Sequence, residues 1–346
     1  MTGDPQLSRR AGRPTMRDIA AAVGTSVMTV SRALNGEAGV SRATAERIFA
    51  AADELGFRRN DLARSLRRGA GTNTIGLVLE HSTTRFYQRL IAGVEEVTDR
   101  QGALVLTASS HSAEREQAAL LALSRRRVDG LLIVPAGSDH AYLRPEHAAG
   151  LPLVFVDREP RGISADTVVA DNRGGGHAAT AHLLAHGHRE IAVVGDRAGI
   201  DTVAQRVDGY RAALAAAGAR ADPRLVALDC ADSQSAQRAV AALLDRDPAP
   251  SALFTLNPVC SIAAVRVLAA RGLRDRVAIV GFDDFEAADL VTPAITVIEH
   301  DIAALGRSAA ELLFARIAGD DTPPRRIELT TALVPRGSGE LPGPHG

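Results

Sequence analysis

The sequence predicts an α/β protein in which a small N-terminal helical unit precedes a larger body of two doubly wound parallel sheets. Three observations predict this fold class. Apolar residues recur with helical spacing at the start of the chain, the pattern changes near residue 72, and apolar runs then alternate with helical segments. At 346 residues, 46% of them hydrophobic, the chain can form two or three domains with separate cores.

The segment 15–34 predicts two short helices joined by a glycine turn. Four apolar residues share one face of the first helix: Met16, Ile19, Ala20 and Val23. Thr15 can cap this helix together with Asp18, Gly24 ends it, and Ser26 can cap the second helix. The second helix would bury Val30, Ala33 and Leu34. It would expose Met28, Ser31 and Arg32. Such a pair is either a helix-turn-helix that enters a DNA groove or an ordinary helical hairpin.

A third helix is expected after Ser41. Its predicted buried face consists of Ala45, Ile48, Phe49, Ala52 and Leu55, and Gly56 closes it. Residues 60–69 begin with a capping asparagine and end with glycine, but they are too few for a helix that is stable alone. We therefore expect a hinge helix that forms only under certain conditions.

The body is predicted from eight apolar runs that read as buried strands. They cover residues 74–80, 103–108, 130–135, 153–157, 190–196, 225–229, 251–256 and 277–284. Because helical patterns separate these runs, we expect two parallel sheets with helices on their faces. Ligands of such sheets bind beyond the carboxyl ends of the strands, so two facing sheets would enclose a cleft.

Charge and composition limit the partners and the compartment. Residues 1–70 contain twelve Arg against seven Asp and Glu, whereas the whole chain has a net charge of -1. A basic segment on an acidic body is typical of polyanion binding, although it can also be a solubilising tail. The chain has no long apolar run and no secretory signal, so we expect a cytoplasmic, nucleoid-associated protein with no membrane partner. Cys230 and Cys260 are expected to be free buried thiols.

Several segments resemble the LacI/GalR family of transcriptional regulators. The resemblance is carried by TMRDIAAAVGTSVMTVSRALNG, VSRATAERI, NDLARSLR, DNRGGGHAATAHLLAHGHREIAVVGD, RVDGYRAAL, VGFDD and PAITVIEHD, in the order of the family, over residues 14–336. It implies a three-helix headpiece with a hinge helix and a two-subdomain body similar to periplasmic sugar-binding proteins. It also implies a sequence-specific DNA-binding regulator, a repressor controlled by a small-molecule effector that is a sugar or a sugar derivative.

The resemblance implies the following division of the chain. The segments are a disordered basic arm (1–13), the headpiece (14–59), a hinge helix and linker (60–72), an effector-binding and dimerisation body (73–336) and a disordered tail (337–346). The chain would cross between the two subdomains of the body near residues 169–171, 299–302 and 325–327.

The implied DNA contacts lie on the headpiece and the hinge. Val27 and Met28 would touch thymine methyl groups, and Arg32 would donate to guanine. The resemblance implies that six residues contact phosphates and so fix the register of the headpiece on the duplex: Thr15, Ser26, Ser31, Asn35, Ser41 and Thr44. For Ser26 and Ser41, helix capping is an equally good explanation. The hinge positions are Asn60, Ala63, which would face its dimer mate, and Leu66, which would wedge into the minor groove or pack on the body. A homodimer bound to a pseudo-palindromic operator follows.

For the effector, the resemblance implies two groups of cleft residues. Polar contacts are implied for Asp157, Arg206, Asn257 and Asp283, and stacking for Phe86 and Tyr87. Alternatively, Arg206 is a solvated helix residue, Asp283 and Asp284 cap the next helix, and Phe86 belongs to the core.

Departures from the family pattern bear on the ligand. His300 stands where glutamine is frequent and Arg85 where proline is usual, which favours an effector with an acid or phosphate group over a neutral hexose. A nucleobase acting as corepressor is the alternative effector.

Two other function classes fit less well. An enzyme could use strand-end carboxylates, but no nucleophile motif is present, and the glycines at 174–176 lack the spacing of a phosphate-binding loop. His182 and His186 have a metal-compatible spacing without a third ligand. A periplasmic solute-binding protein would need a signal sequence and would have no use for a basic head. We therefore predict no catalytic residue, no metal and no cofactor.

Overall fold

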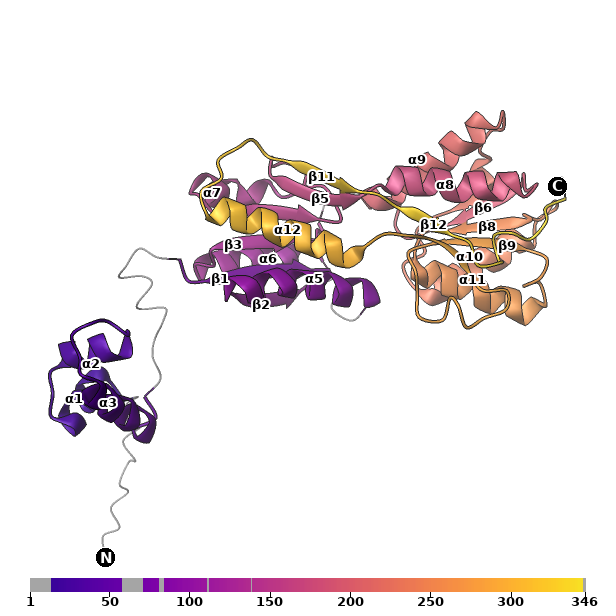
Figure 1. Cartoon of the computed structure of the whole chain (residues 1–346). Coiled ribbons are helices and arrows are strands. Elements are labelled where there is room, and N and C mark those ends of the chain that lie inside the picture. The colour runs from indigo at the N-terminus through magenta and orange to yellow at the C-terminus, as the bar shows by residue number, and fades with distance from the viewer. Residues whose placement is uncertain (1–13, 58–70, 81–83, 111, 138, 345–346) are drawn as a thin grey trace, which may run out of the picture. The chain divides into compact units, whose positions relative to one another are not determined.

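The computed structural model describes residues 14–57, 71–80, 84–110, 112–137 and 139–344. The chain forms two compact units, residues 1–72 and residues 73–346 (Figure 1). None of the described helices combines the length and apolar character that crossing a bilayer requires. The predicted arm (1–13) and residues 60–70 of the predicted hinge and linker (60–72) lie outside the described residues.

Over its described residues 14–57, the headpiece forms three helices, α1 (Met16–Val23), α2 (Val27–Leu34) and α3 (Arg42–Glu54). The predicted caps are present. Asp18 accepts hydrogen bonds of 2.7 Å from both the backbone N–H and the hydroxyl of Thr15, and Ser26 accepts one of 3.0 Å from the N–H of Thr29. Gly24 has a φ of 71°, the left-handed conformation that ends α1 and sets the turn. The three helices bury a common core that includes Ile19, Val30 and Ile48.

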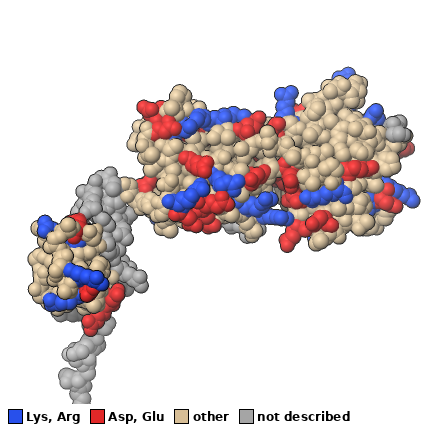
Figure 2. All heavy atoms as spheres, in the orientation of Figure 1, with Lys and Arg blue, Asp and Glu red and all other residues tan. Residues whose placement is uncertain are grey.

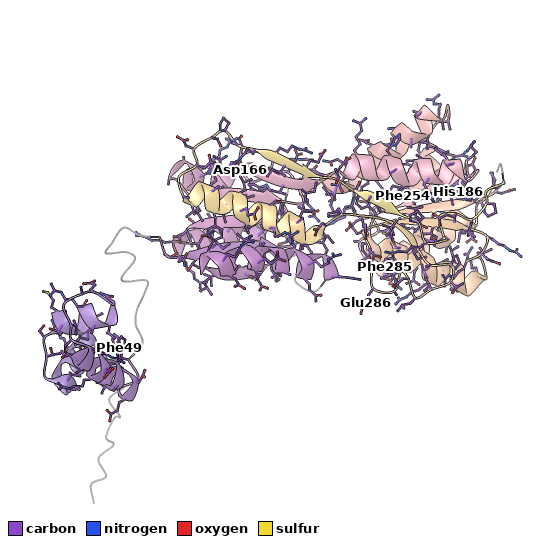
Figure 3. All side chains as sticks on the ribbon, in the orientation of Figure 1. Phe49, Asp166, His186, Phe254, Phe285 and Glu286 are labelled. Carbon is purple, nitrogen blue, oxygen red and sulfur yellow. The ribbon has the colours of Figure 1, made fainter. Side chains whose placement is uncertain are left out.

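The predicted buried face of α3 is wrong at two positions. Phe49 and Leu55 are 48% and 40% exposed, whereas Ile48 and Ala52 are buried as expected. Phe49 is labelled in Figure 3. The error arises because α1 and α2 cover only a narrow stripe of α3, and successive residues of a helix turn by about 100°.

The first sheet of the body has the strand order β11-β5-β4-β3-β1-β2, and its strands are all parallel. Its strands are β1 (Thr74–Leu79), β2 (Leu104–Ser109), β3 (Gly130–Ile133), β4 (Leu153–Val156), β5 (Asp166–Ala170) and β11 (Arg326–Leu329). The helices of this N-terminal subdomain are α5 (Arg85–Gln101), α6 (Ala113–Arg125), the short η1 (Ala141–Leu143), α7 (Arg144–Ala148) and α12 (Ile302–Ile317). Helices α5 and α12 cover one face of the sheet and α6 the other.

The second sheet has the order β12-β10-β9-β8-β6-β7, parallel except for β12. Its strands are β6 (Ile191–Val194), β7 (Val226–Ala227), β8 (Ala252–Thr255), β9 (Ala278–Phe282), β10 (Thr296–Glu299) and β12 (Ala332–Val334). The helices of this C-terminal subdomain are α8 (Asn172–Ala185), α9 (Asp201–Ala216), η2 (Pro223–Leu225), α10 (Ser233–Leu244) and α11 (Pro258–Arg271). The predicted fold class, with two parallel sheets and helices on both faces, is confirmed.

Two edge strands differ from their prediction as buried runs, and one of them, β7 of the second sheet, is only half-buried. Strand β2 is the edge of the first sheet, and its Leu104 is 60% exposed. Acidic and basic side chains are interspersed over the face of the body seen in Figure 2. The acidic excess of the body therefore forms no single-sign patch on that face.

The chain passes between the two subdomains three times. The first passage, at residue 171, and the second, at residues 300–301, fall within the predicted ranges. The third prediction, 325–327, is wrong. Residues 326–329 form β11, which pairs with β5 in the first sheet, so the chain crosses at residues 330–331. The alternating polar residues of this edge strand hide it in the sequence.

The prediction of a disordered tail over residues 337–346 is wrong for residues 337–344. Ser338 is 2% exposed, and its carbonyl accepts a hydrogen bond of 3.0 Å from the N–H of Ile279. Glu340 accepts one of 2.8 Å from the hydroxyl of Thr296, and Nε2 of His188 lies 2.9 Å from the carbonyl oxygen of Leu341. The tail is ordered because it supplies partners for backbone groups at the start of β9 that the short β10 leaves uncovered.

Each subdomain contains one pair of helices in very close contact. A Cβ at Gly306 of α12 would collide with the carbonyl oxygen of Leu90 on α5, and one at Gly209 of α9 would collide with that of Arg173 on α8. Glycine is required at these positions because the backbones approach so closely. The helices that follow the first two crossings, α8 and α12, are thereby fixed within their own subdomains.

Candidate functional site

The candidate DNA-binding surface is the outer face of α2. Met28 and Val27 are 65% and 42% exposed, and Arg32 is exposed on the same helix. Large apolar side chains at this exposure have no role in the headpiece core, which α2 builds from its opposite face. The sequence analysis placed its three base-contacting residues here.

The other predicted contacts of the headpiece divide between caps and accessible polar groups. Ser26 and Ser41 cap α2 and α3, each accepting a hydrogen bond from the backbone N–H three residues on. The hydroxyl of Ser31 accepts a bond of 3.3 Å from the amide of Asn35. Thr15 is exposed and Thr44 is half-buried. Capping and phosphate binding are compatible, because a capped helix still presents backbone N–H groups at its N-terminus. Asn60, Ala63 and Leu66 lie outside the described residues.

The candidate effector site lies where strands of the two sheets end. Asp157 follows β4 in the first sheet, and Asp283 follows β9 in the second. Both aspartates have positive φ angles, 69° and 67°, which is uncommon for residues other than glycine. Backbone strain of this kind persists where the surrounding structure enforces it, and it clusters at binding sites.

Arg206 of α9 is the centre of the polar network in the second subdomain. It is 5% exposed, its Nε donates to Asn172 Oδ1 at 2.8 Å, and its Nη1 lies 3.4 Å from Asp283 Oδ2. Nη1 also donates to the carbonyl oxygen of Leu256, and the guanidinium lies 3.6 Å above the ring of Phe282. The alternative that Arg206 is a solvated helix residue is therefore excluded.

The two subdomains contribute charges to one site. Burial raises the pKa of Asp157, while Arg158, Arg206 and His300 lower it and Asp283 raises it further. Asp157 comes from the first subdomain, and Arg206 and Asp283 come from the second. Four of the predicted effector residues, Asp157, Arg206, Asp283 and His300, are thus close enough to act on one another's charge.

His300 supplies the observation that points most directly to a ligand. Its side chain is fully buried, and Nδ1 lies 3.5 Å from Asp283 Oδ1. Among the described residues, both ring nitrogens of His300 and Oδ1 of Asp283 are buried without a hydrogen-bond partner. Buried polar atoms without partners are rare in proteins, and a bound polar molecule would satisfy them.

The two predicted aromatic residues lie in different surroundings. Phe86, at the start of α5, is half-buried and lies 6.4 Å from the ring of His300. Tyr87 is 5% exposed within the core of the first subdomain, and it meets Phe86 edge to face at 5.1 Å. Phe86 is the aromatic side chain that borders the site, and Tyr87 supports it.

Two further predicted positions have local partners. Asn257 caps α11, and its Oδ1 accepts a hydrogen bond of 2.8 Å from the N–H of Cys260. No helix follows Asp283, so the alternative that Asp283 or Asp284 caps one is excluded. Asp284 instead forms a bidentate pair with Arg336 at 2.8 and 2.9 Å, and these bonds lower the pKa of its carboxyl group.

The sequence analysis missed three charged residues beside the site. Glu80, 4% exposed at the end of β1, binds Arg158 at 2.6 Å and Arg197 at 2.7 Å. Because Arg197 belongs to the second subdomain, Glu80 links the two. Glu80 ends an apolar strand run just as Asp157 does, and this shared position was the available signal.

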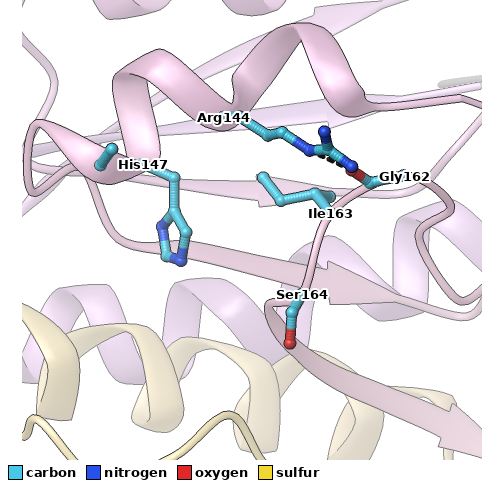
Figure 4. A pocket seen from close by; sticks show the side chains of 6 residues that line it. Arg144, His147, Gly162, Ile163 and Ser164 are labelled. Carbon is cyan, nitrogen blue, oxygen red and sulfur yellow. Dashed lines mark hydrogen bonds between the residues drawn. The ribbon is translucent and has the colours of Figure 1, made fainter.

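Two cavities lie in the first subdomain or at its border. One of about 420 Å³ lies between the subdomains, and Arg158, Arg161, Arg197 and Asp201 are among its walls. The other, of about 410 Å³, is the open pocket of Figure 4 beside α7, and it contains none of the predicted effector residues. In the second pocket, Arg144 donates its Nε to the carbonyl oxygen of Gly162 at 2.6 Å.

The described residues hold no cluster of three His, Cys, Asp or Glu side chains suited to a metal ion. The two histidines with metal-compatible spacing, His182 and His186, have ring centroids 4.5 Å apart. His182 is paired with Glu340 of the tail.

Comparisons with known proteins agree with this architecture. The family described as bacterial regulatory proteins, lacI family, matches residues 15–60, and the family described as periplasmic binding proteins and sugar binding domain of LacI family matches residues 72–336. The HTH-type transcriptional regulator CelR of Thermobifida fusca is 35% identical over 342 residues, covering 95% of this chain and 99% of CelR. The repressor PurR of Aliivibrio fischeri strain MJ11 is 30% identical over 330 residues, with 94% and 98% covered.

Solved structures show the same likeness. A complex of the transcriptional regulator CelR with cellobiose has a TM-score of 0.71 at 34% identity, covering 94% of this chain and all of that one. The Lac repressor dimer bound to operator and the anti-inducer ONPF has a TM-score of 0.82 at 24% identity, covering 94% and 99%, which is a likeness of fold. With a helix-turn-helix unit joined to a periplasmic-binding-protein-like body, the chain belongs to the LacI family of bacterial transcriptional regulators.

Proposed function

We propose that this protein is a homodimeric repressor that binds a pseudo-palindromic operator through two headpieces and responds to a neutral sugar bound between the subdomains of its body. The observation that carries the effector proposal is the buried pair His300 and Asp283, whose polar atoms lack hydrogen-bond partners among the described residues and which act on the charge of Asp157 from the other subdomain. Effector binding at such a site would favour one arrangement of the subdomains over another and thereby alter operator affinity.

The DNA proposal rests on the exposed face of α2. Arg32 would read guanine by bidentate donation, and Val27 and Met28 would contact thymine methyl groups. Selection from random duplexes is expected to return a two-fold symmetric site, because a symmetric dimer presents two identical headpieces. Recovery of sites without two-fold symmetry would contradict the proposal.

The hinge proposal concerns Leu66 as a minor-groove wedge. Leu66→Ala is expected to weaken binding to the selected operator much more than binding to nonspecific duplex, since only the specific complex uses the kinked step. Both affinities are measured by fluorescence anisotropy at one fixed salt concentration. Leu104→Ala, which truncates an exposed leucine of β2 in the body, is the matched control. Equal losses on both duplexes would remove Leu66 from the interface.

The contacts of the cleft favour a neutral effector over the acid-bearing one that His300 and Arg85 suggested. Arg206 is bound to Asn172 and Asp283, and Arg158 is bound to Glu80, so the charge of each inner arginine is already balanced. Among the described residues of the site, the buried atoms without a hydrogen-bond partner are Oδ1 of Asp283, both ring nitrogens of His300 and Nε of Arg158, and such atoms accept from or donate to hydroxyl groups. An anionic ligand would bring another negative charge to a site that already holds three carboxylates.

A ligand panel tests this assignment. Thermal shift with sugars, sugar acids, sugar phosphates and nucleobases identifies ligands, since any ligand that binds only the native state raises the melting temperature. Asp283→Asn is expected to abolish the response to the active sugar and to leave operator affinity in its absence within about twofold. Arg211→Gln serves as the matched surface control. Sugar acids that bind better than their neutral parents would contradict the neutral-effector proposal.

We infer further that the protein acts in the cytoplasm by binding alone, without a catalytic step. Its membership of a family of transcriptional regulators supports this inference. The active ligand should be recovered chemically unchanged after prolonged incubation with the protein, as measured by mass spectrometry. Turnover of the ligand would contradict the inference.

A further inference from the structure

A polar cavity lies at the end of the second sheet that is opposite to the effector site. Arg189 and Glu190, which directly precede β6, and Pro248, in the loop before β8, are among its walls. Asp283, by contrast, follows β9, which runs parallel to β8. Because parallel strands start at one edge of a sheet and end at the other, the length of the sheet separates this cavity from the effector site. We call it the distal cavity.

Four arginines from three separate parts of the chain line the distal cavity: Arg189, Arg220, Arg224 and Arg246. One of them, Arg224, is already paired. Its Nε donates to both carboxylate oxygens of Asp222, at 3.0 and 2.9 Å, and its Nη2 lies 2.7 Å from one of them. The charge of Asp222 is thereby balanced within its own loop. Three arginines remain for a ligand.

Two of the remaining arginines are without partners. Within the described residues, the side chains of Arg220 and Arg246 form no hydrogen bond and no ion pair, although Arg246 is half-buried. Hydrogen bonds from Arg224 lower the pKa of Asp222 most, and the positive charge of Arg246 lowers it further, so Arg246 lies near that carboxylate. A half-buried guanidinium in this position keeps its charge and its hydrogen-bond donors for a ligand.

The third remaining arginine, Arg189, is held in place by the backbone. Its Nη1 donates to the carbonyl oxygens of Leu184 and His188, at 3.0 and 3.1 Å. Its Nε and Nη2 have no partner in the part of the chain that the structure describes. Arg189 therefore offers the distal cavity an oriented guanidinium with donors to spare.

Two carboxylates complete the wall. Glu190 and Asp247 each directly follow one of these arginines in the chain, and both are exposed. Neither side chain is bonded to another described residue. With Asp222 balanced, the wall carries three arginines against two carboxylates, a net charge of +1. Arginine matches the oxygens of a phosphate group, whereas carboxylates accept hydrogen bonds from hydroxyl groups. The wall therefore suits a ligand that carries both groups.

The size of the distal cavity limits what it can enclose. Its volume is about 150 Å³, the room of about five water molecules at about 30 Å³ each. Sites that enclose a whole small molecule have about 300–1,000 Å³. The cavity thus fits one charged group of a larger ligand. A phosphate group brings three strong acceptor oxygens, which three arginines can satisfy.

We propose that the distal cavity binds the phosphate group of a phosphate monoester whose hydroxyl-bearing part, a sugar or a nucleoside, lies at the opening of the cavity. Arg189, Arg220 and Arg246 donate to the phosphate oxygens. Glu190 and Asp247 accept from the hydroxyl groups. This site shares no residue with the proposed sugar site, so either proposal can fail without the other.

The first test compares ligands. Isothermal titration of the full-length protein uses three phosphate monoesters (ribose 5-phosphate, glucose 6-phosphate and adenosine 5′-monophosphate), their unphosphorylated parents and inorganic phosphate. At least one monoester is expected to bind about tenfold or more tightly than its parent and than inorganic phosphate, because only the monoester reaches arginines and carboxylates together. The tightest monoester shows whether a sugar or a nucleoside carries the group. Monoesters that bind no better than their parents or than inorganic phosphate would overturn the proposal.

The second test removes the arginines that have no partner. Arg220→Gln and Arg246→Gln are each expected to weaken monoester binding about tenfold, without a change in the urea midpoint because neither side chain holds another described residue. Arg238→Gln, which removes an exposed arginine of α10 that does not line the cavity, is the matched control and should stay within about twofold. Unchanged binding in both cavity variants, or equal weakening by Arg238→Gln, would overturn the proposal.

The third test separates the distal cavity from the effector site. Asp283→Asn should leave monoester binding within about twofold, because Asp283 lies at the other end of the sheet. Loss of monoester binding in Asp283→Asn, with normal binding in Arg246→Gln, would place the monoester in the effector site and refute the distal one. Glu190→Ala combined with Asp247→Ala should reduce the preference for the monoester over inorganic phosphate about threefold or more. An unchanged preference would refute the contact with hydroxyl groups.

Discussion

Replacing Arg206 with methionine removes the donor that holds three groups of the inner site together. Asn172 loses a bond of 2.8 Å, Asp283 loses its cation at 3.4 Å, and Phe282 loses the guanidinium above its ring. Breaking a buried ion pair by removing one partner costs about 3–5 kcal/mol, because the remaining charge is left uncompensated. Asp283 is 9% exposed, which favours the lower part of this range. We therefore expect Arg206→Met to destabilise the body by about 3 kcal/mol.

Tyrosine fluorescence reports the unfolding of the body without a contribution from the headpiece. The chain has three tyrosines and no tryptophan, and all three tyrosines (Tyr87, Tyr142 and Tyr210) lie in the body. Tyr87 and Tyr210 are 5% and 1% exposed, so unfolding transfers their rings to water. Urea unfolding monitored by tyrosine fluorescence, at one fixed protein concentration, gives the midpoint and slope for each variant.

A double variant decides whether the uncompensated charge causes the loss. Arg206→Met combined with Asp283→Asn should recover about 1–2 kcal/mol relative to Arg206→Met alone, because no carboxylate is then left without its cation. Headpiece binding to nonspecific DNA should be unchanged in all three variants. A loss below about 1 kcal/mol for the single variant, or strictly additive losses in the double variant, would refute the reasoning.

Three further predictions concern the caps and the connections of the body. Ser26→Ala should destabilise the headpiece by about 1 kcal/mol through loss of its cap, as measured by hydrogen exchange of α2 amides, and unchanged exchange would contradict the capping role. Arg316→Met should lower the free energy of unfolding of the body by about 3 kcal/mol, as measured by urea unfolding, since Arg316 binds the 4% exposed side chain of Asp166 at 2.6 and 2.9 Å. Burial raises the pKa of the Glu340 carboxyl group, but hydrogen bonds from Thr296 and other donors lower it below 4.5 overall. The stability that the Glu340 carboxylate gives to the folded body is therefore present above pH 4.5 and is lost as the pH falls through the lowered pKa. Glu340→Gln should flatten this acid dependence of the midpoint, and an unchanged pH profile would exclude the carboxylate.

The parts of the fold that could be predicted are those in which local pattern and burial agree. Central parallel strands such as β1, β4 and β9 are buried on both faces, so each appears as a continuous apolar run. The sequence analysis did not identify β5, β10, β11 and β12. Strands β11 and β12 are short and lie at sheet edges, and β11 pairs with a strand about 160 residues away. Only this long-range pairing makes them strands.

The candidate site could be predicted as a set of strand-end residues but not as a set of contacts. Asp157 and Asp283 stand out because a carboxylate directly follows an apolar run. The partners of Arg206 come from three separate segments of the chain, and its pairing with Asn172 depends on how α8 packs against α9. The exposure of Phe49 follows from the same limit, because helical spacing does not show how wide a face the neighbouring helices cover.

The interleaving of the two subdomains constrains how the protein is made. The headpiece is continuous in the chain, so its core is complete once residue 57 has left the ribosome. The N-terminal subdomain, by contrast, needs α12 and β11, which are among the last elements to be synthesised. Until they emerge, the face of the first sheet that α12 covers has no partner, and its apolar side chains stay exposed to chaperones or to neighbouring chains. Slowing translation shortly before residue 302 should therefore increase aggregation of the nascent body while leaving a folded headpiece at its N-terminus.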